Sequence, residues 1–280
     1  MIISKVLGGM GNQMFQYAMA FALAKRSKQE FKIDNSSLLS HGERTFDLNH
    51  FHISAELASL RDFSKLGMSF LSYPLIKLKK HPKYYLEKDF SFNQNIFDNK
   101  SPIYLNGYFQ SDKYFLDFEN DIRKELTFKT DLNDIEKKFL EIIHSTTAIS
   151  VHVRRGDYVQ NPILAPLPLN YYEKSINKML EHISNPTFFV FSDDLQWVKE
   201  NLKIRHPVIY VEGNTGKNSF RDMRLMRFCQ HHIIANSSFS WWGAWLNPEP
   251  NKIVFAPKEW FIDKVINDKD LIPSTWIKIN

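Results

Sequence analysis

The stretch AISVHV at residues 148–153, followed by NYYEKSINKMLEHI at 170–183 and TFFVFS at 187–192, decides the fold class of this chain. Two short apolar runs flank a segment whose apolar residues recur at helical spacing. The same alternation continues through VIYV at 208–211, SFRDMRLMRFC at 219–229, HIIAN at 232–236, FSWWGAWL at 239–246 and KIVFAP at 252–257. Strands that alternate with helices of this length predict βαβ units and a parallel sheet, so we expect an α/β fold.

The amino-terminal end predicts a second unit of the same kind. The strand IISKV at 2–6 leads into GGMGNQ at 8–13, then into a helix from about Asn12 and the short run FKID at 31–34. The basic, aromatic stretch LIKLKKHPKYYLEKD at 75–89 is typical of a solvated helix or a surface loop. The pattern is least regular at 129–145, so we expect two domains, at residues 1–145 and 146–280.

Composition excludes several classes of protein. The 280 residues are 43% hydrophobic and 24% charged, as in folded globular domains, and no stretch approaches the roughly 20 apolar residues of a membrane span. The net charge of +5 suits a phosphate-bearing ligand or an anionic membrane surface and does not require nucleic acid. The single cysteine, Cys229, excludes an intrachain disulfide framework. With no signal-peptide pattern at the start, these features predict a cytosolic protein.

The motif HVRRGDY at 152–158 is the strongest single signal for a binding site. Ligands bind beyond the carboxyl ends of the strands in a doubly wound sheet, and Arg154 and Arg155 stand there. Guanidinium groups are rigid, permanently charged forks that suit phosphate oxygens, and Asp157 is a partner that could hold one of them. The motif therefore predicts a pyrophosphate site. The alternative is a surface turn with an Arg–Asp pair, which Gly156 would also permit.

The glycine-rich turn at 8–13 is the second signal. Glycines between a strand and a helix let backbone N–H groups approach a ligand at the positive end of the helix. With Gly9 and Gly11 as the first two glycines of a dinucleotide fingerprint, Met14 stands where the third is required, so the pattern falls short. Asn12 and Gln13 would present amides to sugar hydroxyls, although Asn12 also suits a helix N-cap.

The segment NSSFSWWGAWL at 236–246 is the third signal. Hydroxyl groups and free N–H groups at the start of a helix favour an anion site, for which Ser237 and Ser238 are the candidates. Ordinary N-capping by a serine is the alternative. The three tryptophans of this segment, Trp241, Trp242 and Trp245, are interpreted as core residues.

Acidic and histidine residues complete the candidates. Asp193 and Asp194 could hold a metal, act as acid and base, or cap the helix that follows, and capping accounts for one of them. Asp222 either completes a capping box with the serine three residues earlier or accepts two N–H donors from a guanine edge. His231 and His232 have no third ligand at metal spacing and are interpreted as structural.

Five motifs together resemble the bacterial α-1,2-fucosyltransferases, the family eleven glycosyltransferases. They are GGMGNQMFQYA at 8–18, GYFQSDKYF at 107–115, HVRRGDY at 152–158, FSDD at 191–194 and NSSFSWWGAWL at 236–246. The resemblance implies a GT-B fold of two Rossmann-type domains facing a cleft. It also implies a GDP-fucose donor held mainly by the carboxyl-terminal domain, transfer with inversion, and no obligatory metal or other cofactor.

The resemblance also assigns roles to residues. Arg154 would clamp the β-phosphate, with His152 and Asp222 near the guanosine. The resemblance names no general base; Asp157 is our candidate for it, and its alternative role is to orient Arg154 or Arg155. The donor-binding residues implied in this way are Gly9, Gly11, Gln13, His152, Arg154, Arg155, Asp222, Ser237, Ser238 and Phe239, and the catalytic ones are Asn12, Arg154 and Asp157.

The predicted function is therefore transfer of L-fucose from GDP-fucose to the 2-hydroxyl of a galactoside, in surface-polysaccharide (O-antigen) synthesis. The expected partners are GDP-fucose and a galactose-terminated glycan or glycolipid, with no nucleic acid. The expected location is the cytoplasm, with peripheral contact to the inner membrane. Two alternatives remain at this point: a nicotinamide-dependent oxidoreductase that uses the glycine-rich turn, and a non-catalytic module that binds nucleotides or nucleic acid.

Overall fold

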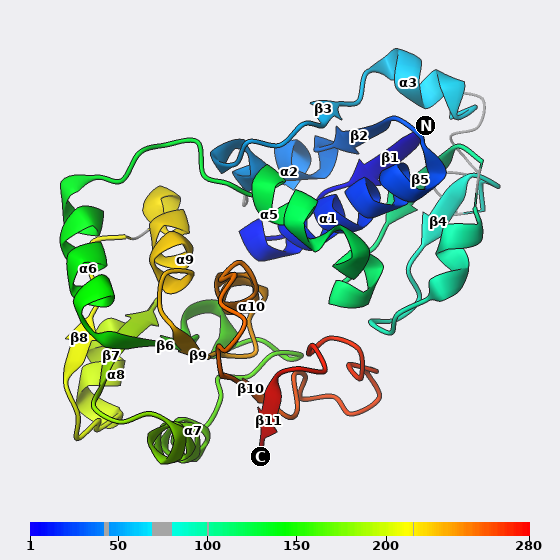
Figure 1. The fold of residues 1–280 in the computed structure, drawn as a ribbon. Coiled ribbons are helices and arrows are strands. Elements are labelled where there is room, and N and C mark those ends of the chain that lie inside the picture. The colour runs from blue at the N-terminus through cyan, green and yellow to red at the C-terminus, as the bar shows by residue number, and fades with distance from the viewer. Residues whose placement is uncertain (42–44, 69–79, 100, 215) are drawn as a thin grey trace. The chain divides into compact units, whose positions relative to one another are not determined.

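A computed structural model of the chain describes residues 1–41, 45–68, 80–99, 101–214 and 216–280 (Figure 1). The chain divides into two compact units. Unit 1 comprises Met1–Lys129 with Lys269–Leu271, and unit 2 comprises Thr130–Asp268 with Ile272–Asn280. The boundary lies earlier than the expected residue 145, because the segment expected to be irregular is helix α6 (Asp134–Ser145). Its Ile143 is fully buried in a hydrophobic cluster of unit 2.

Unit 1 contains a parallel sheet covered by helices. Among the described residues the strand order is β3-β2-β1-β5-β4, and every neighbouring pair is parallel. Its elements are β1 (Ile2–Lys5), α1 (Met10–Ser27), β2 (Phe31–Asp34), α2 (Ser36–His41), β3 (Glu56–Leu57), α3 (Leu60–Lys65), β4 (Tyr84–Leu86), β5 (Ile103–Asn106) and α5 (Glu119–Glu125). Of the stretch at 75–89, residues 75–79 lie outside the described residues, and 84–86 form edge strand β4 instead of the expected helix or loop.

Helix α1 follows β1 directly and is buried along most of its length. From Ala18 to Ala24 small alanines alternate with Met19, Phe21 and Leu23, so the helix packs closely against its surroundings, and each buried large side chain contributes about 1.5–3 kcal/mol. The helix begins at Met10 with Gly9 as N-cap, so the alternative in which Asn12 caps it is wrong. The turn needs glycine at position 8, where φ is +77° and a Cβ would lie 2.6 Å from Asn12 Nδ2.

Unit 2 confirms the predicted alternation of strands and helices. Among the described residues its sheet has the order β11-β10-β9-β6-β7-β8, again with all pairs parallel. Its elements are α6, β6 (Thr147–Val153), α7 (Leu169–His182), β7 (Pro186–Ser192), α8 (Leu195–Asn201), β8 (Val208–Tyr210), α9 (Phe220–Met226), β9 (His231–Ile233), α10 (Ser238–Trp245), β10 (Val254–Pro257) and β11 (Ile277–Ile279). Strand β6 is buried at every position after the first, as expected for a central parallel strand.

The strand order of each sheet reverses direction once, and ligands of doubly wound folds bind at such a point. In unit 1 the reversal lies between β1 and β5, because β2 and β3 extend to one side of β1 while β5 and β4 extend to the other. In unit 2 it lies between β6 and β9. The glycine-rich turn follows β1, and the paired arginines follow β6, so both sequence signals stand at a switch point of their own sheet.

Candidate functional site

The arginine motif of unit 2 forms a network of ion pairs at the carboxyl ends of β6 and β7. Asp157 Oδ1 accepts from Arg154 Nε at 3.1 Å and from its terminal nitrogen at 2.6 Å. Asp193 Oδ2 lies 3.2 Å from the other terminal nitrogen. The Arg154 side chain keeps 25% of its surface exposed, so its guanidinium is held from two sides and still accessible. Such a held, charged fork is suited to binding a diphosphate.

Arg155 is held by a separate pair of contacts. Its Nε lies 3.1 Å from Asp194 Oδ2, and its guanidinium lies 3.6 Å from the centre of the Trp197 ring. Asp194 is also the N-cap of α8, where its Oδ1 accepts from the Trp197 backbone N–H. The expectation that capping explains one aspartate of the pair is confirmed, and both aspartates also pair with arginines.

The glycine of the motif allows Asp193 to approach the loop closely. A Cβ at Gly156 would lie 2.5 Å from Asp193 Oδ2 and 3.2 Å from its Cγ. Asp193 Oδ1 in turn accepts from the Arg155 backbone N–H at 2.9 Å. The alternative, a surface turn with an Arg–Asp pair, is present as the Arg154–Asp157 pair, and the loop is in addition bound to the end of the neighbouring strand.

His152 is the last but one residue of β6 and is 5% exposed. Its ring centre lies 5.7 Å from that of Phe239, which follows Ser238 at the start of α10. Burial and the nearby Arg154 lower the pKa of His152 to about 3, so the imidazole is neutral. Its Nδ1 is buried and has no hydrogen-bond partner among the described residues. A buried polar atom in this state indicates a position where a ligand could supply the partner.

The start of α10 stands next to these residues across the switch point. Ser237 is the N-cap residue, yet it makes no side-chain capping hydrogen bond, so the capping alternative is not what the structure shows. The Tyr158 hydroxyl donates to the Asn236 carbonyl at 3.2 Å and joins the arginine loop to this segment. The three tryptophans of α10 are buried and pack on one another, which confirms them as core residues.

Asp222 lies in the first turn of α9 and is partly buried. Its Oδ1 accepts from Asn214 Nδ2 at 2.8 Å, and Ser219 makes no side-chain capping bond, so the capping-box alternative is wrong. Burial, with a smaller contribution from the charge of Glu136, raises the pKa of Asp222 to about 7.

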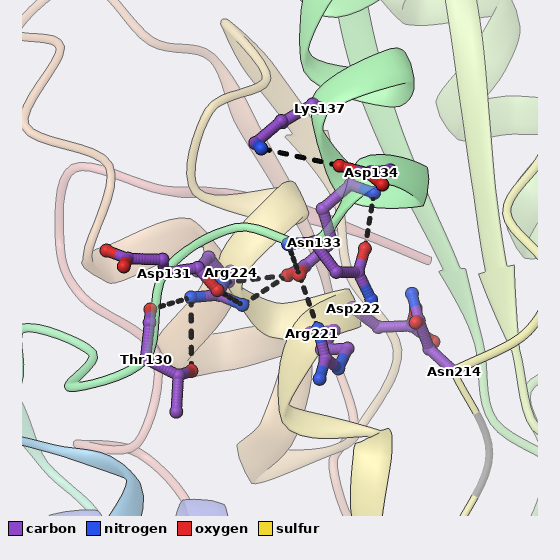
Figure 2. Close-up of polar contacts among 10 residues, drawn as sticks. Thr130, Asp131, Asn133, Asp134, Lys137, Asn214, Arg221, Asp222 and Arg224 are labelled. Carbon is purple, nitrogen blue, oxygen red and sulfur yellow. Dashed lines mark hydrogen bonds and ion pairs between the residues drawn. The ribbon is translucent and has the colours of Figure 1, made fainter.

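A buried ion-pair network fixes α9, the helix that carries Asp222 (Figure 2). Glu136 of α6 is fully buried and accepts from Arg221 at 2.6 Å and from Arg224 Nε at 2.8 Å. It also accepts from the backbone N–H of Asn133, with which it forms the capping box of α6. Because breaking a buried pair leaves an uncompensated charge, this network holds α9 in one position relative to α6.

The histidine pair is structural, as expected. His232 is fully buried, and its two ring nitrogens contact Ser150 Oγ at 2.7 Å and Asn247 Nδ2 at 2.9 Å. Burial holds the pKa of His232 well below its usual range. His231 Nδ1 accepts from the Ile253 backbone N–H at 3.0 Å.

The glycine-rich turn of unit 1 is surrounded by neutral amides. Gln13 is fully buried, donates to the carbonyls of Gly8 and Thr45, and accepts from the Asp47 backbone N–H. It therefore holds the turn in place, and the expectation that its amide faces the donor is not supported. Asn12 Oδ1 accepts from Gln110 Nε2 at 2.8 Å, which joins the turn after β1 to the loop after β5.

Glu87 is a residue of this edge that sequence reasoning missed. It follows β4, and its carboxylate accepts from the backbone N–H groups of Tyr108 and Phe109 at 2.6 and 3.0 Å. A Cβ at Gly107 would lie 2.4 Å from Glu87 Cβ, so the glycine that opens the GYFQSDKYF motif is required by this contact. Burial raises the pKa of Glu87 to about 7. The carboxylate thus positions the loop that carries Gln110.

The charges at the unit 2 edge are arranged as arginine–aspartate pairs. Within the part of the chain that the structure describes, no three His, Cys, Asp or Glu side chains gather as a metal site would require. Nor does any helix there combine the length and the apolar character needed to cross a bilayer.

Comparison with known proteins identifies the family. The family model described as "Glycosyl transferase family 11" matches residues 2–280. This chain belongs to glycosyl transferase family 11. It is 35% identical to an α-1,2-colitosyltransferase of Escherichia coli, over 99% of this chain and 98% of that protein. It is 34% identical to the O-antigen biosynthesis glycosyltransferase WbnK of Escherichia coli, over 97% and 98% of the two chains.

Solved structures agree with the fold. The fucosyltransferase NodZ from Bradyrhizobium aligns with a TM-score of 0.54 at 17% identity, over 88% of this chain and 92% of that one. Arabidopsis thaliana FUT1 aligns with a TM-score of 0.52 at 11% identity, over 92% and 71%. These structures have the GT-B fold, so the expected α/β, GT-B class is confirmed. Because the chain belongs to a glycosyltransferase family, the two alternative functions, an oxidoreductase and a nucleic-acid-binding module, are excluded.

Proposed function

We propose that this glycosyltransferase moves L-fucose from GDP-fucose to the 2-hydroxyl of a galactoside in O-antigen synthesis. The observation that carries the proposal is the Arg154 guanidinium, held by Asp157 and Asp193 at the switch point of the unit 2 sheet and still a quarter exposed. The names of the relatives support the reaction class, since one is an α-1,2-colitosyltransferase and another an O-antigen glycosyltransferase.

The arrangement suits stabilisation of a departing nucleoside diphosphate. As the bond between the sugar and the diphosphate breaks, negative charge grows on the phosphate oxygens, and donors fixed in advance lower the energy of that state. Arg154 supplies such donors without reorganisation because two aspartates already orient it. The neighbouring Arg155 and the start of α10 would add positive potential from two further elements.

The guanosine would lie toward His152 and Asp222. The neutral His152 ring has a buried nitrogen without a partner, and its face lies against Phe239. Asp222 would accept from the N–H groups of the guanine edge beside its existing bond to Asn214. These two residues would therefore select guanine, while the arginines would bind the diphosphate whatever the base.

Asp157 is an orienting residue in this proposal and not the general base. One of its oxygens already accepts two N–H groups of Arg154. The acceptor hydroxyl would attack the anomeric carbon from the face opposite the departing GDP, which gives inversion in a single displacement. In unit 1, Gly9, Gly11 and Asn12 would contact sugar hydroxyl groups. Gln13 holds the turn that carries them, and Glu87 holds the neighbouring loop after β5.

Transfer of colitose is the second candidate, and the 35% identity to a colitosyltransferase favours it. Colitose lacks the 3-hydroxyl of fucose, so the two donors differ in one hydrogen-bonding group. A competition assay with GDP-fucose and GDP-colitose on N-acetyllactosamine separates the candidates by kcat/KM. We expect GDP-fucose to be used at the higher kcat/KM. A higher kcat/KM for GDP-colitose would make colitose the transferred sugar, and transfer from neither donor would contradict the proposed reaction.

We also propose that transfer needs no divalent metal, because the aspartates that could bind one are already paired with arginines. Activity should therefore persist after dialysis against EDTA. The measurement is the initial rate before and after chelation, and again after magnesium or manganese is added back. A rate that falls with EDTA and returns with the metal would contradict the proposal and would assign Asp193 and Asp194 to metal binding.

The proposed setting is the cytoplasm, where the nucleotide sugar is available, with peripheral contact to the inner membrane that carries the growing polysaccharide. The net charge of +5 supports attraction to an anionic surface. Co-sedimentation with vesicles of anionic and of neutral lipid tests this contact, and equal recovery in the supernatant with both would contradict it.

A further inference from the structure

A pocket opens at the carboxyl edge of the unit 2 sheet. It lies between Asn236, which follows β9, and the ends of the next two strands, β10 and β11. Its volume is about 350 Å³, within the range of small-ligand sites. The ends of β10 and β11, the segment before α7 and the segment at 258–262 surround it. Its walls are mainly apolar and include Pro166, Tyr171, Trp260 and Phe261, while Lys258 and Glu259, both exposed, add charged side chains to the lining.

Asn236 lines the pocket and carries an unused acceptor. The residue is 3% exposed, and its Nδ2 donates to the Ala165 carbonyl at 3.0 Å and to the Trp260 carbonyl at 3.1 Å. These two bonds fix the amide, because exchanging its ends would set an oxygen against two carbonyls. Its Oδ1 is buried and has no partner among the described residues. A buried acceptor of this kind requires a donor, and a ligand hydroxyl can supply it.

Asn236 also connects the pocket to the arginine network. Its backbone carbonyl accepts from the Tyr158 hydroxyl, and the Tyr158 ring centre lies 5.3 Å from the Arg154 guanidinium. The Tyr158 side chain thus lies between the proposed phosphate clamp and the residue that lines the pocket. The pocket is therefore suited to a part of the substrate that lies beside the reacting groups without taking part in the reaction.

We propose that this pocket binds a sugar ring of the acceptor glycan, with one ring hydroxyl donating to Asn236 Oδ1. A pyranose presents a face of C–H groups to apolar walls and hydroxyl groups at its edge, which matches apolar walls that contain one buried acceptor. A lipid chain would leave Oδ1 without a partner. A nucleobase would have to reach past Tyr158 from the diphosphate. The proposal deepens the proposed function and rests on it.

The test uses three variants of the full chain, one of them a control. Ile262→Trp enlarges a side chain that lines the pocket and is 52% exposed, so folding should tolerate it. Ile277→Trp is the matched control, at a 42% exposed position of β11 that does not line the pocket. Asn236→Ala removes Oδ1 but also two bonds to the main chain, so its binding data are interpreted only if its melting temperature is unchanged.

Binding of free lactose and N-acetyllactosamine in the presence of GDP is measured by saturation-transfer NMR, which does not depend on turnover. We expect Ile262→Trp to weaken glycan binding about tenfold or more, as steric exclusion from a shaped pocket does, while GDP binding and the control stay unchanged. Equal glycan affinity in Ile262→Trp and wild type would overturn the pocket assignment alone. Weaker GDP binding instead would assign the pocket to the donor and overturn it too.

A separate arm uses a lipid-linked glycan, and a loss confined to that acceptor would show that lipid occupies the pocket. Failure of the wild type to bind any of these glycans, with GDP binding intact, would count against the galactoside acceptor itself. That outcome overturns both the proposed function and this inference, and the variants distinguish it from failure of the pocket alone.

Discussion

The two switch points use the same backbone plan with opposite chemistry. After β6, the edge of unit 2 carries two arginines paired with three aspartates. After β1, the edge of unit 1 carries the amides of Asn12, Gln13 and Gln110, and the carboxylate of Glu87 contacts only main-chain N–H groups in the bonds described above. The charged edge suits a diphosphate, and the neutral edge suits hydroxyl groups. A doubly wound sheet thus determines where a ligand binds, and the loop residues determine which ligand.

The largest effect is expected for Arg154→Lys, which tests whether the charged edge binds the diphosphate through a guanidinium. The variant keeps the charge but replaces the planar fork by a single ammonium. The lysine cannot contact Asp157, Asp193 and a phosphate with the same geometry. We expect kcat/KM to fall at least 100-fold, on the order of 3 kcal/mol, and GDP affinity to fall with it. Arg205→Lys at an exposed position is the control. If turnover and GDP affinity both stay within about threefold of wild type, under 1 kcal/mol, Arg154 is not the clamp.

The second prediction concerns Gly156→Ala, which tests whether the loop must lie against Asp193. The added Cβ would displace the Asp193 carboxylate and, through it, the Arg154 guanidinium. We expect activity to fall about tenfold from this misplacement. Because the clash needs the carboxylate, adding Gly156→Ala to Asp193→Ala should cost little more. Fully additive losses in this double-mutant cycle would show that the glycine serves another purpose.

The third prediction sharpens the distinction between base recognition and charge. Asp222→Asn exchanges an acceptor oxygen for a donor amide, so GDP should bind about tenfold more weakly, with preference over ADP reduced. Wild-type affinity for GDP should also rise as the pH rises through about 7, because guanine N–H groups favour the ionised carboxylate, and the variant should lack this rise. Calorimetry at several pH values measures both effects. Asp98→Asn at an exposed position is the control, and an unchanged pH profile in Asp222→Asn would exclude the base contact.

The smallest expected effect concerns the neutral edge. Burial raises the pKa of Glu87 from 4.5 to about 7, so folding takes up a proton between these values. Ionised Glu87 therefore lowers stability above pH 7, and this cost disappears as the pH falls. Relative to Glu87→Gln, the wild type should gain on the order of 1–2 kcal/mol of unfolding free energy between about pH 8 and about pH 5.5. Denaturant titrations measure the difference, with exposed Glu173→Gln as control. A constant difference would mean that Glu87 does not titrate in this range.

The parallel sheet of unit 2 could be predicted from sequence because its strands are short, continuous apolar runs. Helix α6 was missed although it carries a readable signal, since Asn133 and Glu136 form the capping box that starts it. Strand β4 carries no such signal. Its residues are only partly buried, and it is a strand because β5 offers hydrogen bonds to it. Propensity cannot reveal an edge strand of this kind.

The candidate site divides in the same way. The arginine pair could be predicted because it stands at the end of a strand that the pattern reveals. The roles of its neighbours could not be predicted, since they depend on contacts between distant parts of the chain. Asp193 meets Gly156 from another strand, and Glu87 meets Gly107 across 20 positions. Gln13 was misinterpreted for the same reason, because the carbonyl of Thr45 that occupies its amide is remote in sequence.

The return of residues 269–271 to unit 1 has a consequence for synthesis. Asp270 accepts from Lys113 at 2.5 Å and from the Phe92 backbone N–H at 2.9 Å, so a late residue completes an early unit. The rest of unit 1 has left the ribosome well before Asp270 is made. Until then Lys113 and the Phe92 backbone N–H cannot form these bonds. Unit 1 therefore acquires its last polar contacts only after most of unit 2 has been synthesised, and neither unit corresponds to one uninterrupted stretch of the gene.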